Sequence, residues 1–360
     1  MTRLAQTLGL TEFQTEIVST VRQFVDKEVI PVAMDLEHAD TYPQAIVDQM
    51  KEMGLFGLMI PEEYGGLGES LLTYALCVEE LARGWMSVSG VINTHFIVAY
   101  MIRQHGTEEQ KRYHLTKMAT GESRGAFSMS EPELGSDVAA IRTKAVRGDD
   151  GDYTISGQKM WLTNGGSSTL VAVLVRTDEG ADKPHRNLTA FLIEKPSGFG
   201  EVLPGVTIPG KLDKMGWRSS DTAELSYTDV RVPAENLVGP LNGGWRVANG
   251  ALGHERTMMW MQYADRVHNL VEDFHPITAL ERDSYATLLM DHQALRLLGS
   301  AAVAKASRGE EDMTTISVLK VLGSEAERDA TEAALESMGV EGLRHPANTS
   351  AYAPYDLDYL

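Results

Sequence analysis

A loop-forming stretch, FSMSEPELGSD at residues 127–137, gathers polar side chains that could hold a ligand. It offers hydroxyls from Ser128, Ser130 and Ser136, and Gly135 would let a ligand approach the backbone closely. Loops on a rigid scaffold are where binding and catalytic residues usually lie. Capped turns without any function use the same residue types, so this stretch alone leaves both interpretations open.

A second stretch, KMWLTNGG at residues 159–166, places a large aromatic side chain beside polar groups. The indole of Trp161 could stack on a planar cofactor, with the hydroxyl of Thr163 and the amide of Asn164 nearby. The alternative is a tryptophan at a strand end that packs in the core while Asn-Gly makes the turn.

A third stretch, GHERTMMW at residues 253–260, contains two charges in an otherwise apolar helical pattern. A carboxylate surrounded by apolar residues has a raised pKa, so Glu255 could act as a general base beside Arg256. A lone helical glutamate more commonly lies on a solvated stripe, and the pattern alone favours that alternative.

The elements that must position these stretches differ along the chain. Apolar residues recur at helical spacing in the first 122 residues, and Thr11 with Gln14 forms a predicted capping box. Helices are expected at residues 11–34, 45–53, 71–83, 88–103 and 108–118. This part of the chain is predicted to be an N-terminal helical domain, residues 1–122.

From residue 125 the pattern changes to short runs rich in β-branched residues, bounded by Gly, Asp, Asn or Pro. We expect an antiparallel middle β-domain, residues 123–237. After the bend GPLNGGW, helices are expected at residues 247–274, 277–308 and 313–338, and the last twenty residues look irregular. These form a predicted C-terminal helical domain, residues 238–360.

The order of helices, strands and helices excludes the βαβ alternation of a Rossmann domain, and no GxGxxG or Walker loop occurs. A nucleotide cofactor would therefore have to bind between domains. The fold class is predicted to be α+β and multidomain.

Composition excludes several function classes. With 51 acidic and 32 basic residues, the formal charge of -19 argues against a nucleic-acid partner, although a locally basic site could still bind an anionic ligand. The single cysteine, Cys77, can form neither an internal disulfide nor a cysteine-cluster metal site, so no metal is expected. No secretory leader or membrane span is recognisable, and a cytoplasmic location is expected.

The three stretches, taken in order with two further motifs, resemble the acyl-CoA dehydrogenase family from about residue 11 to about residue 345. The similar motifs are IPEEYGG, FSMSEPELGSD, SGQKMWLTNGG, KMGWRSSDTAELSYTDVRVP and the helix with Glu255-Arg256. The resemblance implies a helical domain, a β-barrel-like domain and a C-terminal helical bundle, with FAD between the last two. It also implies an acyl-CoA substrate and an electron-transferring flavoprotein, or a similar acceptor, as partner.

The resemblance assigns a role to each matching residue. It implies that Glu255 is the base that takes the α-proton, placed as in the isovaleryl-CoA and long-chain types. The residues implied to contact the flavin are Phe127, Met129, Ser130, Trp161 and Thr163. Those implied to bind the substrate are Ser136 and Arg256 on the coenzyme A side. The acyl side is expected to be lined by the segment from Thr94 to Tyr100 and by the methionine-rich face after Arg256.

The C-terminal third departs from the family pattern. Arg282 is retained where the family contacts the neighbouring subunit's FAD, but Ser284, Tyr285 and Ala286 replace the rest of that motif. A Gly-Gly pair near the adenine is also missing, so Gly339 is the candidate contact there. The closing helix of the family is not recognisable before the chain ends. A homodimer or homotetramer is expected, and a heteromer is conceivable.

Two competing functions fit the same residues. An acyl-CoA oxidase or flavin monooxygenase of this fold would differ in the reaction of its reduced flavin with oxygen. A partner subunit that retains the fold but binds cofactor poorly is favoured by the altered C-terminal motifs and opposed by Glu255, Trp161 and Thr163.

Overall fold

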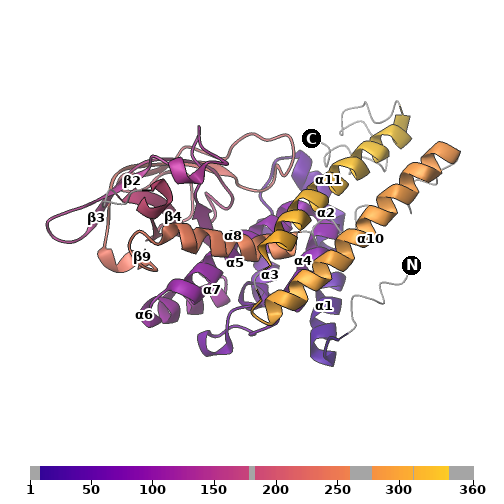
Figure 1. Cartoon of the computed structure of the whole chain (residues 1–360), viewed down its shortest axis with the longest axis horizontal. Coiled ribbons are helices and arrows are strands. Elements are labelled where there is room, and N and C mark those ends of the chain that lie inside the picture. The colour runs from indigo at the N-terminus through magenta and orange to yellow at the C-terminus, as the bar shows by residue number, and fades with distance from the viewer. Residues whose placement is uncertain (1–8, 178–182, 260–277, 311, 340–360) are drawn as a thin grey trace.

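The structure is a computed structural model that describes residues 9–177, 183–259, 278–310 and 312–339. The strands gather at one side of the molecule, and the long helices α10 and α11 lie at the other (Figure 1). Helices α5 and α8 run through the middle and connect the two sides. No helix among the described residues is long and apolar enough to cross a membrane.

The N-terminal part consists of helices, as its periodicity predicts. The longer ones are α1 (Glu12–Phe24), α2 (Ile30–His38), α3 (Gln44–Glu52), α4 (Leu71–Gly84) and α5 (Met86–His105). A continuous last segment comprises α6 (Glu108–Gln110), the π-helical η5 (Lys111–Leu115) and α7 (Thr116–Ala119). The capping box at the start of α1 is confirmed. The Thr11 side chain accepts a hydrogen bond from the Gln14 backbone N–H, and the Gln14 side chain accepts one from the Thr11 backbone N–H.

The expected first helix is interrupted by a π-helical turn, η2 (Val25–Val29). Pro31, in the first turn of α2, has no backbone N–H and cannot continue an α-helical ladder across this point. The Ile30 N–H instead bonds to the Val25 carbonyl, one residue farther back than in an α-helix. The helical path then continues to His38, beyond the predicted end.

A buried carboxylate fastens α2 to the rest of the fold. Glu37 is only 6% exposed, and it accepts hydrogen bonds from Trp85 Nε1 and Ser87 Oγ, both at 2.9 Å. It also accepts from the backbone N–H groups of Arg218 and Ser219 in the KMGWRSSD loop. One side chain thus connects the start of α5 with a loop of the β-domain.

The middle of the chain is one sheet with strand order β6-β7-β8-β3-β2-β4-β5-β9, and β1 pairs with β4. Its strands are β1 (Gly125–Ser128), β2 (Lys144–Arg147), β3 (Tyr153–Leu162), β4 (Leu170–Thr177), β5 (Leu188–Glu194), β6 (Gly200–Leu203), β7 (Val206–Ile208), β8 (Ala223–Val232) and β9 (Leu237–Val238). Most strand pairs are antiparallel, as expected, but β4 pairs in parallel with β1 and β2, which the pattern did not predict. Those connections contain enough chain to cross over, which parallel neighbours require.

Strand β4 separates two cores. Leu170, Ala172 and Leu174 pack into the large core shared with the helices, whereas Val171 and Val173 pack into the core of the β-domain. Successive strand residues point to opposite faces, so a strand covered on both sides is apolar throughout. This explains the continuous apolar run in the sequence.

The C-terminal helices are α8 (Gly244–Met259), α10 (Ala279–Ser307) and α11 (Met313–Met338). The predicted continuation of α8 to residue 274 and the irregular last twenty residues lie outside the described residues. Helices α10 and α11 form an antiparallel pair, with Tyr285 Oη and Ser337 Oγ 2.8 Å apart near one end. Helix α8 packs against α5, α10 and α11, and α10 also contacts α4 directly, so both helices join the bundle to the N-terminal helices.

Candidate active site

The FSMSEPELGSD loop lies along the end of β3. The Met160 backbone N–H donates to the Ser130 carbonyl at 2.9 Å, and Lys159 Nζ donates to the Met129 carbonyl at 2.8 Å. Phe127, on the adjoining strand β1, is half-buried, as is Met129. The structure therefore brings the first two predicted stretches together.

A buried ion pair fixes this loop. Lys159 Nζ lies 3.1 Å from Glu131 Oε1, and Glu131 also accepts from the backbone N–H groups of Arg142 and Thr143. Burial lowers the pKa of Lys159 to about 8, opposed by the negative charge of Glu131. Burial acts to raise the pKa of Glu131, but the Lys159 charge and the two backbone donors hold it below its usual value.

The side chain of Trp161 is exposed at the protein surface. It is 58% exposed and its backbone has a positive φ of 64°, which is uncommon for a residue with a side chain. The turn after it is anchored, because the buried Asn164 donates through Nδ2 to the Val91 carbonyl at 2.9 Å. Thr163, between them, is half-buried. The core-packing alternative for Trp161 is excluded by its exposure.

Helix α5 meets several parts of the site within six residues. Gly90 faces Trp217 so closely that an added Cβ would lie 3.0 Å from the indole. The Val91 carbonyl accepts the hydrogen bond from Asn164. His95 Nε2 bonds to the Phe56 carbonyl, and His95 Nδ1 accepts from the backbone N–H of Gly125 at the start of β1. Burial lowers the pKa of His95 to about 3, so this link is a neutral imidazole.

Glu255, on α8, is half-buried between helices and does not lie on a solvated stripe. Burial raises its pKa, against three effects that lower it: a hydrogen bond from Asn93 and the charges of Lys320 and Arg256. The Asn93 amide donates to Glu255 Oε1 at 3.2 Å, from α5. Arg256 is also half-buried and follows directly on the same helix.

The predicted acyl-side residues lie on the same pair of helices. Tyr100 on α5 stacks on His254 of α8, with ring centroids 4.4 Å apart and planes inclined by 17°. Thr94 is 9% exposed. The methionine-rich face predicted after Arg256 falls on side chains that are not described. Ser136 is exposed in its loop.

Arg282 and Gly339 lie elsewhere. Arg282 is exposed in the first turn of α10, and Gly339 caps the end of α11, so both are at one end of the helix pair (Figure 1). That end is on the opposite side of the molecule from the strands. Within one chain the structure does not bring these two residues to Trp161.

The described residues suit a planar, hydrogen-bonding cofactor such as a flavin. An exposed indole on an anchored backbone of positive φ gives a stacking surface. Thr163, two residues along the chain, and Ser130, bonded through its carbonyl to the Met160 N–H, supply hydroxyls that can bond to the edge of a ring.

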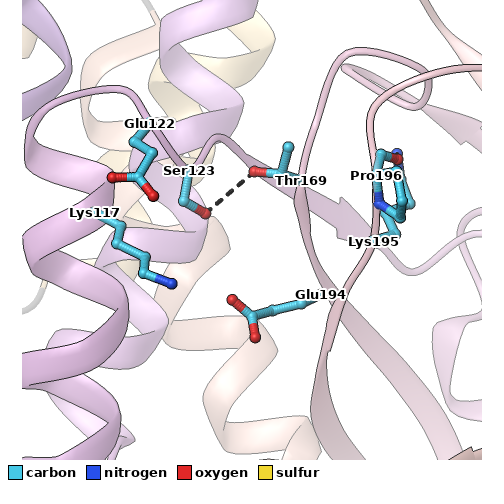
Figure 2. Close-up of a pocket in the computed structure, with 7 residues that line it drawn as sticks. All are labelled: Lys117, Glu122, Ser123, Thr169, Glu194, Lys195 and Pro196. Atoms are coloured by element: carbon cyan, nitrogen blue, oxygen red, sulfur yellow. Dashed lines mark hydrogen bonds between the residues drawn. The ribbon is translucent and has the colours of Figure 1, made fainter.

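A separate polar pocket of about 400 Å³ lies between the end of the N-terminal helices and the β-domain (Figure 2). Its lining includes two carboxylates and two lysines, and a hydrogen bond of 3.3 Å runs from Thr169 to Ser123. It is lined by Lys117, Glu122, Ser123, Thr169, Glu194, Lys195 and Pro196. This lining is unsuited to an acyl chain and shares no residue with the predicted site.

Sequence reasoning missed Asn93, Lys159 and Glu131. A poor helix former within an apolar helix was a signal for Asn93, and a lysine at an inward position of a strand was a signal for Lys159. The partner of each is distant in sequence, so no local pattern could have identified the pairs.

Comparison with known proteins agrees with this architecture. Three family models match the chain: "Acyl-CoA dehydrogenase, N-terminal domain" at residues 11–122, "middle domain" at 126–230 and "C-terminal domain" at 242–353. A Megasphaera elsdenii protein named "Acyl-CoA dehydrogenase, short-chain specific" is 31% identical over 351 residues, covering 93% of this chain and 90% of that protein.

Solved structures are similar over nearly the whole chain. Butyryl-CoA dehydrogenase from Megasphaera elsdenii has a TM-score of 0.88 at 28% identity, covering 98% of this chain and 93% of that one. A chain from a structure of the electron transferring flavoprotein of Acidaminococcus fermentans has a TM-score of 0.87 at 28% identity, covering 97% and 92%. This chain belongs to the acyl-CoA dehydrogenase family. Membership confirms the predicted three-part fold, the oxidoreductase class and FAD-dependent dehydrogenation of an acyl-CoA.

Proposed function

We propose that this protein removes two hydrogens from an acyl-CoA thioester, with Glu255 as the base for the α-proton. The Cα–H bond breaks to give a proton to Glu255, and the Cβ–H bond breaks as a double bond forms between the two carbons. FAD, when bound, supplies the acceptor for the β-hydrogen as a hydride. The product is the 2-enoyl thioester.

The position and environment of Glu255 carry this proposal. The α-proton of a thioester is a weak acid, so a base needs a pKa above that of an exposed carboxylate. Burial raises the pKa of Glu255, and Asn93 fixes one of its oxygens. Arg256, the next residue, can form an ion pair with the negatively charged coenzyme A part of the substrate.

The proposed flavin-binding residues are Phe127, Met129, Ser130, Trp161 and Thr163, with Trp161 as the stacking surface. Ser136 is proposed to hold the coenzyme A arm, and Thr94 and Tyr100 the acyl side. The ends of α10 and α11 that carry Arg282 and Gly339 lie away from the strands. They are therefore proposed to reach the FAD of a neighbouring copy in a homodimer or homotetramer.

We also propose an electron-transferring flavoprotein as the acceptor of the electrons. Similarity to the chain in the Acidaminococcus fermentans structure supports this class of partner. A cytoplasmic location is proposed as well, and the buried, unpaired thiol of Cys77 is compatible with reducing conditions.

The test is an anaerobic titration of the FAD-supplemented protein with a panel of acyl-CoA thioesters, following loss of flavin absorbance. Bleaching by one class of thioester is expected, and that class identifies the substrate. A protein that takes up no FAD, or a flavin that no thioester bleaches, would contradict the proposed function. Rapid reoxidation by oxygen of the reduced, product-bound flavin would indicate an oxidase instead.

The role of Glu255 needs its own variant. Glu255→Gln should still bind FAD and thioester but lose most of the bleaching rate, because the amide cannot accept the α-proton. Glu332→Gln, an exposed glutamate on α11, is the matched control and should bleach at the normal rate. Near-normal bleaching by Glu255→Gln would remove Glu255 from the mechanism.

A further inference from the structure

Asn93 is a buried amide in the middle of a largely apolar helix. It is 7% exposed, and its neighbours on α5 include Ile92, Phe96 and Ile97, all buried. Asparagine is a poor helix former, and burying an amide is costly unless it forms hydrogen bonds. The Asn93 side chain donates a 3.2 Å hydrogen bond from Nδ2 to Glu255 Oε1. The residue is therefore unfavourable for the helix alone and gains its partner from another domain.

We propose that Asn93 is a positioning residue for the reaction, holding the Glu255 carboxylate in one orientation and in the charged form that can accept a proton. The proposal rests on the proposed function of Glu255. A donor aimed at a carboxylate favours its charged form, and a fixed donor restricts the rotamers of a long side chain. Burial alone would leave Glu255 protonated over more of the pH range.

The other groups that act on Glu255 cannot orient it in this way. Two cations, Lys320 from α11 and Arg256 from its own helix, lower its pKa through their charge. Tyr74, from α4, is fully buried, and its hydroxyl has no hydrogen-bond partner among the described residues. Burial and the charge of Glu255 keep the pKa of Tyr74 well above its usual value, so it stays neutral. Asn93 is the hydrogen-bond partner of the carboxylate within the described residues.

The connection also spans domains. Asn93 is three residues from Gly90 and two from Val91, through which α5 meets Trp217 and the turn behind Trp161. A rigid helix therefore sets the position of the base relative to the surface proposed for the flavin. Small displacements of a catalytic group reduce rates strongly, which gives this bond a functional consequence.

The test compares Asn93→Leu, which retains the size but removes the donor, with Asn93→Gln, which retains an amide. For each, the rate of flavin bleaching by the best thioester is measured against pH. In Asn93→Leu the rising acid limb of the profile should move to higher pH, because the charged form loses its donor. If the limb moves by one pH unit, the rate on the acid side falls by about tenfold. In Asn93→Gln the acid limb should lie between that of Asn93→Leu and that of the unsubstituted protein.

Ser89→Ala, which removes another buried polar group of α5, is the matched control. Its melting temperature can change, but its acid limb should stay in place. A loss of rate in Asn93→Leu that is equal at every pH would indicate packing alone and would overturn the proposal.

A direct titration separates this proposal from the function of Glu255. The carboxyl carbon of ¹³C-labelled glutamate is followed by NMR, and Glu255→Gln assigns the Glu255 signal. The titration midpoint of that signal should be higher in Asn93→Leu than in the unsubstituted protein. An unchanged midpoint would refute the role of Asn93, whereas a higher midpoint with normal bleaching by Glu255→Gln would refute only the assignment of the base.

Discussion

Lys159 and Glu131 form a buried ion pair of 3.1 Å that joins strand β3 to the loop proposed to meet the flavin. The ammonium also donates to the Met129 carbonyl, so one side chain holds two points of that loop. Removing one partner from a buried pair leaves an uncompensated charge.

Lys159→Met should therefore lower the free energy of unfolding by about 3 kcal/mol and weaken FAD binding. Chemical denaturation and FAD titration measure the two effects. Lys144→Met, at an exposed position on β2, is the control and should change neither. Adding Glu131→Gln to Lys159→Met should restore part of the lost stability, because it removes the unpaired negative charge and retains an acceptor for a backbone N–H group. No recovery would mean that the pair does not act as described.

Trp161→Ala should weaken FAD binding without destabilising the fold. An aromatic side chain stacked on a planar ligand contributes about 1 kcal/mol or more, whereas a residue 58% exposed contributes little to the core. Fluorescence titration of the apoprotein gives the affinity, and thermal melting without FAD gives the stability. Val146→Ala, 52% exposed on β2, is the surface control. Unchanged FAD affinity would exclude stacking.

Glu255→Gln should make the apoprotein more stable at neutral pH. Burial raises the pKa of Glu255, so the folded state retains this proton at pH values where the unfolded chain has lost it. The free energy of unfolding of the unsubstituted protein therefore falls as pH rises through that interval, and glutamine has no such loss. The stability difference should grow from about pH 4 upward and then level off, as urea denaturation at several pH values can measure. A constant difference would contradict the raised pKa.

Glu37→Ala should be among the most destabilising changes in the N-terminal part. Its carboxylate accepts from Trp85, Ser87 and two backbone N–H groups, and each buried donor left unpaired costs about 1 kcal/mol or more. We expect a loss of about 3 kcal/mol in urea denaturation. Glu28→Ala, exposed in the same helical segment, should have little effect. An equal loss of stability in the two variants would show that the hydrogen bonds of Glu37 do not stabilise the fold.

Much of the fold was predictable because its local signals agree. Thr11 and Gln14 marked a helix start, and the change from helical to strand periodicity near Gly125 marked the change of architecture. The π-helical turn before Pro31 and the parallel pairing of β4 were not predicted. The first depends on how neighbouring helices pack, and the second on which strands meet after long connections.

The site was predictable only in part for the same reason. Trp161 and Glu255 stand in recognisable stretches, but exposure of the first and burial of the second are properties of the assembled domains. Asn93 lies 162 residues from Glu255 in the sequence, and the hydrogen bond between them forms only because α5 and α8 pack side by side. Composition and spacing carry no information on such a contact.

If the proposed site residues bind as inferred, helix α5 should make the binding of cofactor and substrate interdependent. It supports the turn behind Trp161, the start of β1 and the carboxylate of Glu255, so any local opening of this helix would disturb all three. A ligand that binds only the closed arrangement suppresses such opening and leaves less ordering for the next ligand. FAD and the thioester should then each raise the affinity for the other by an equal factor, even without direct contact between the groups that bind them.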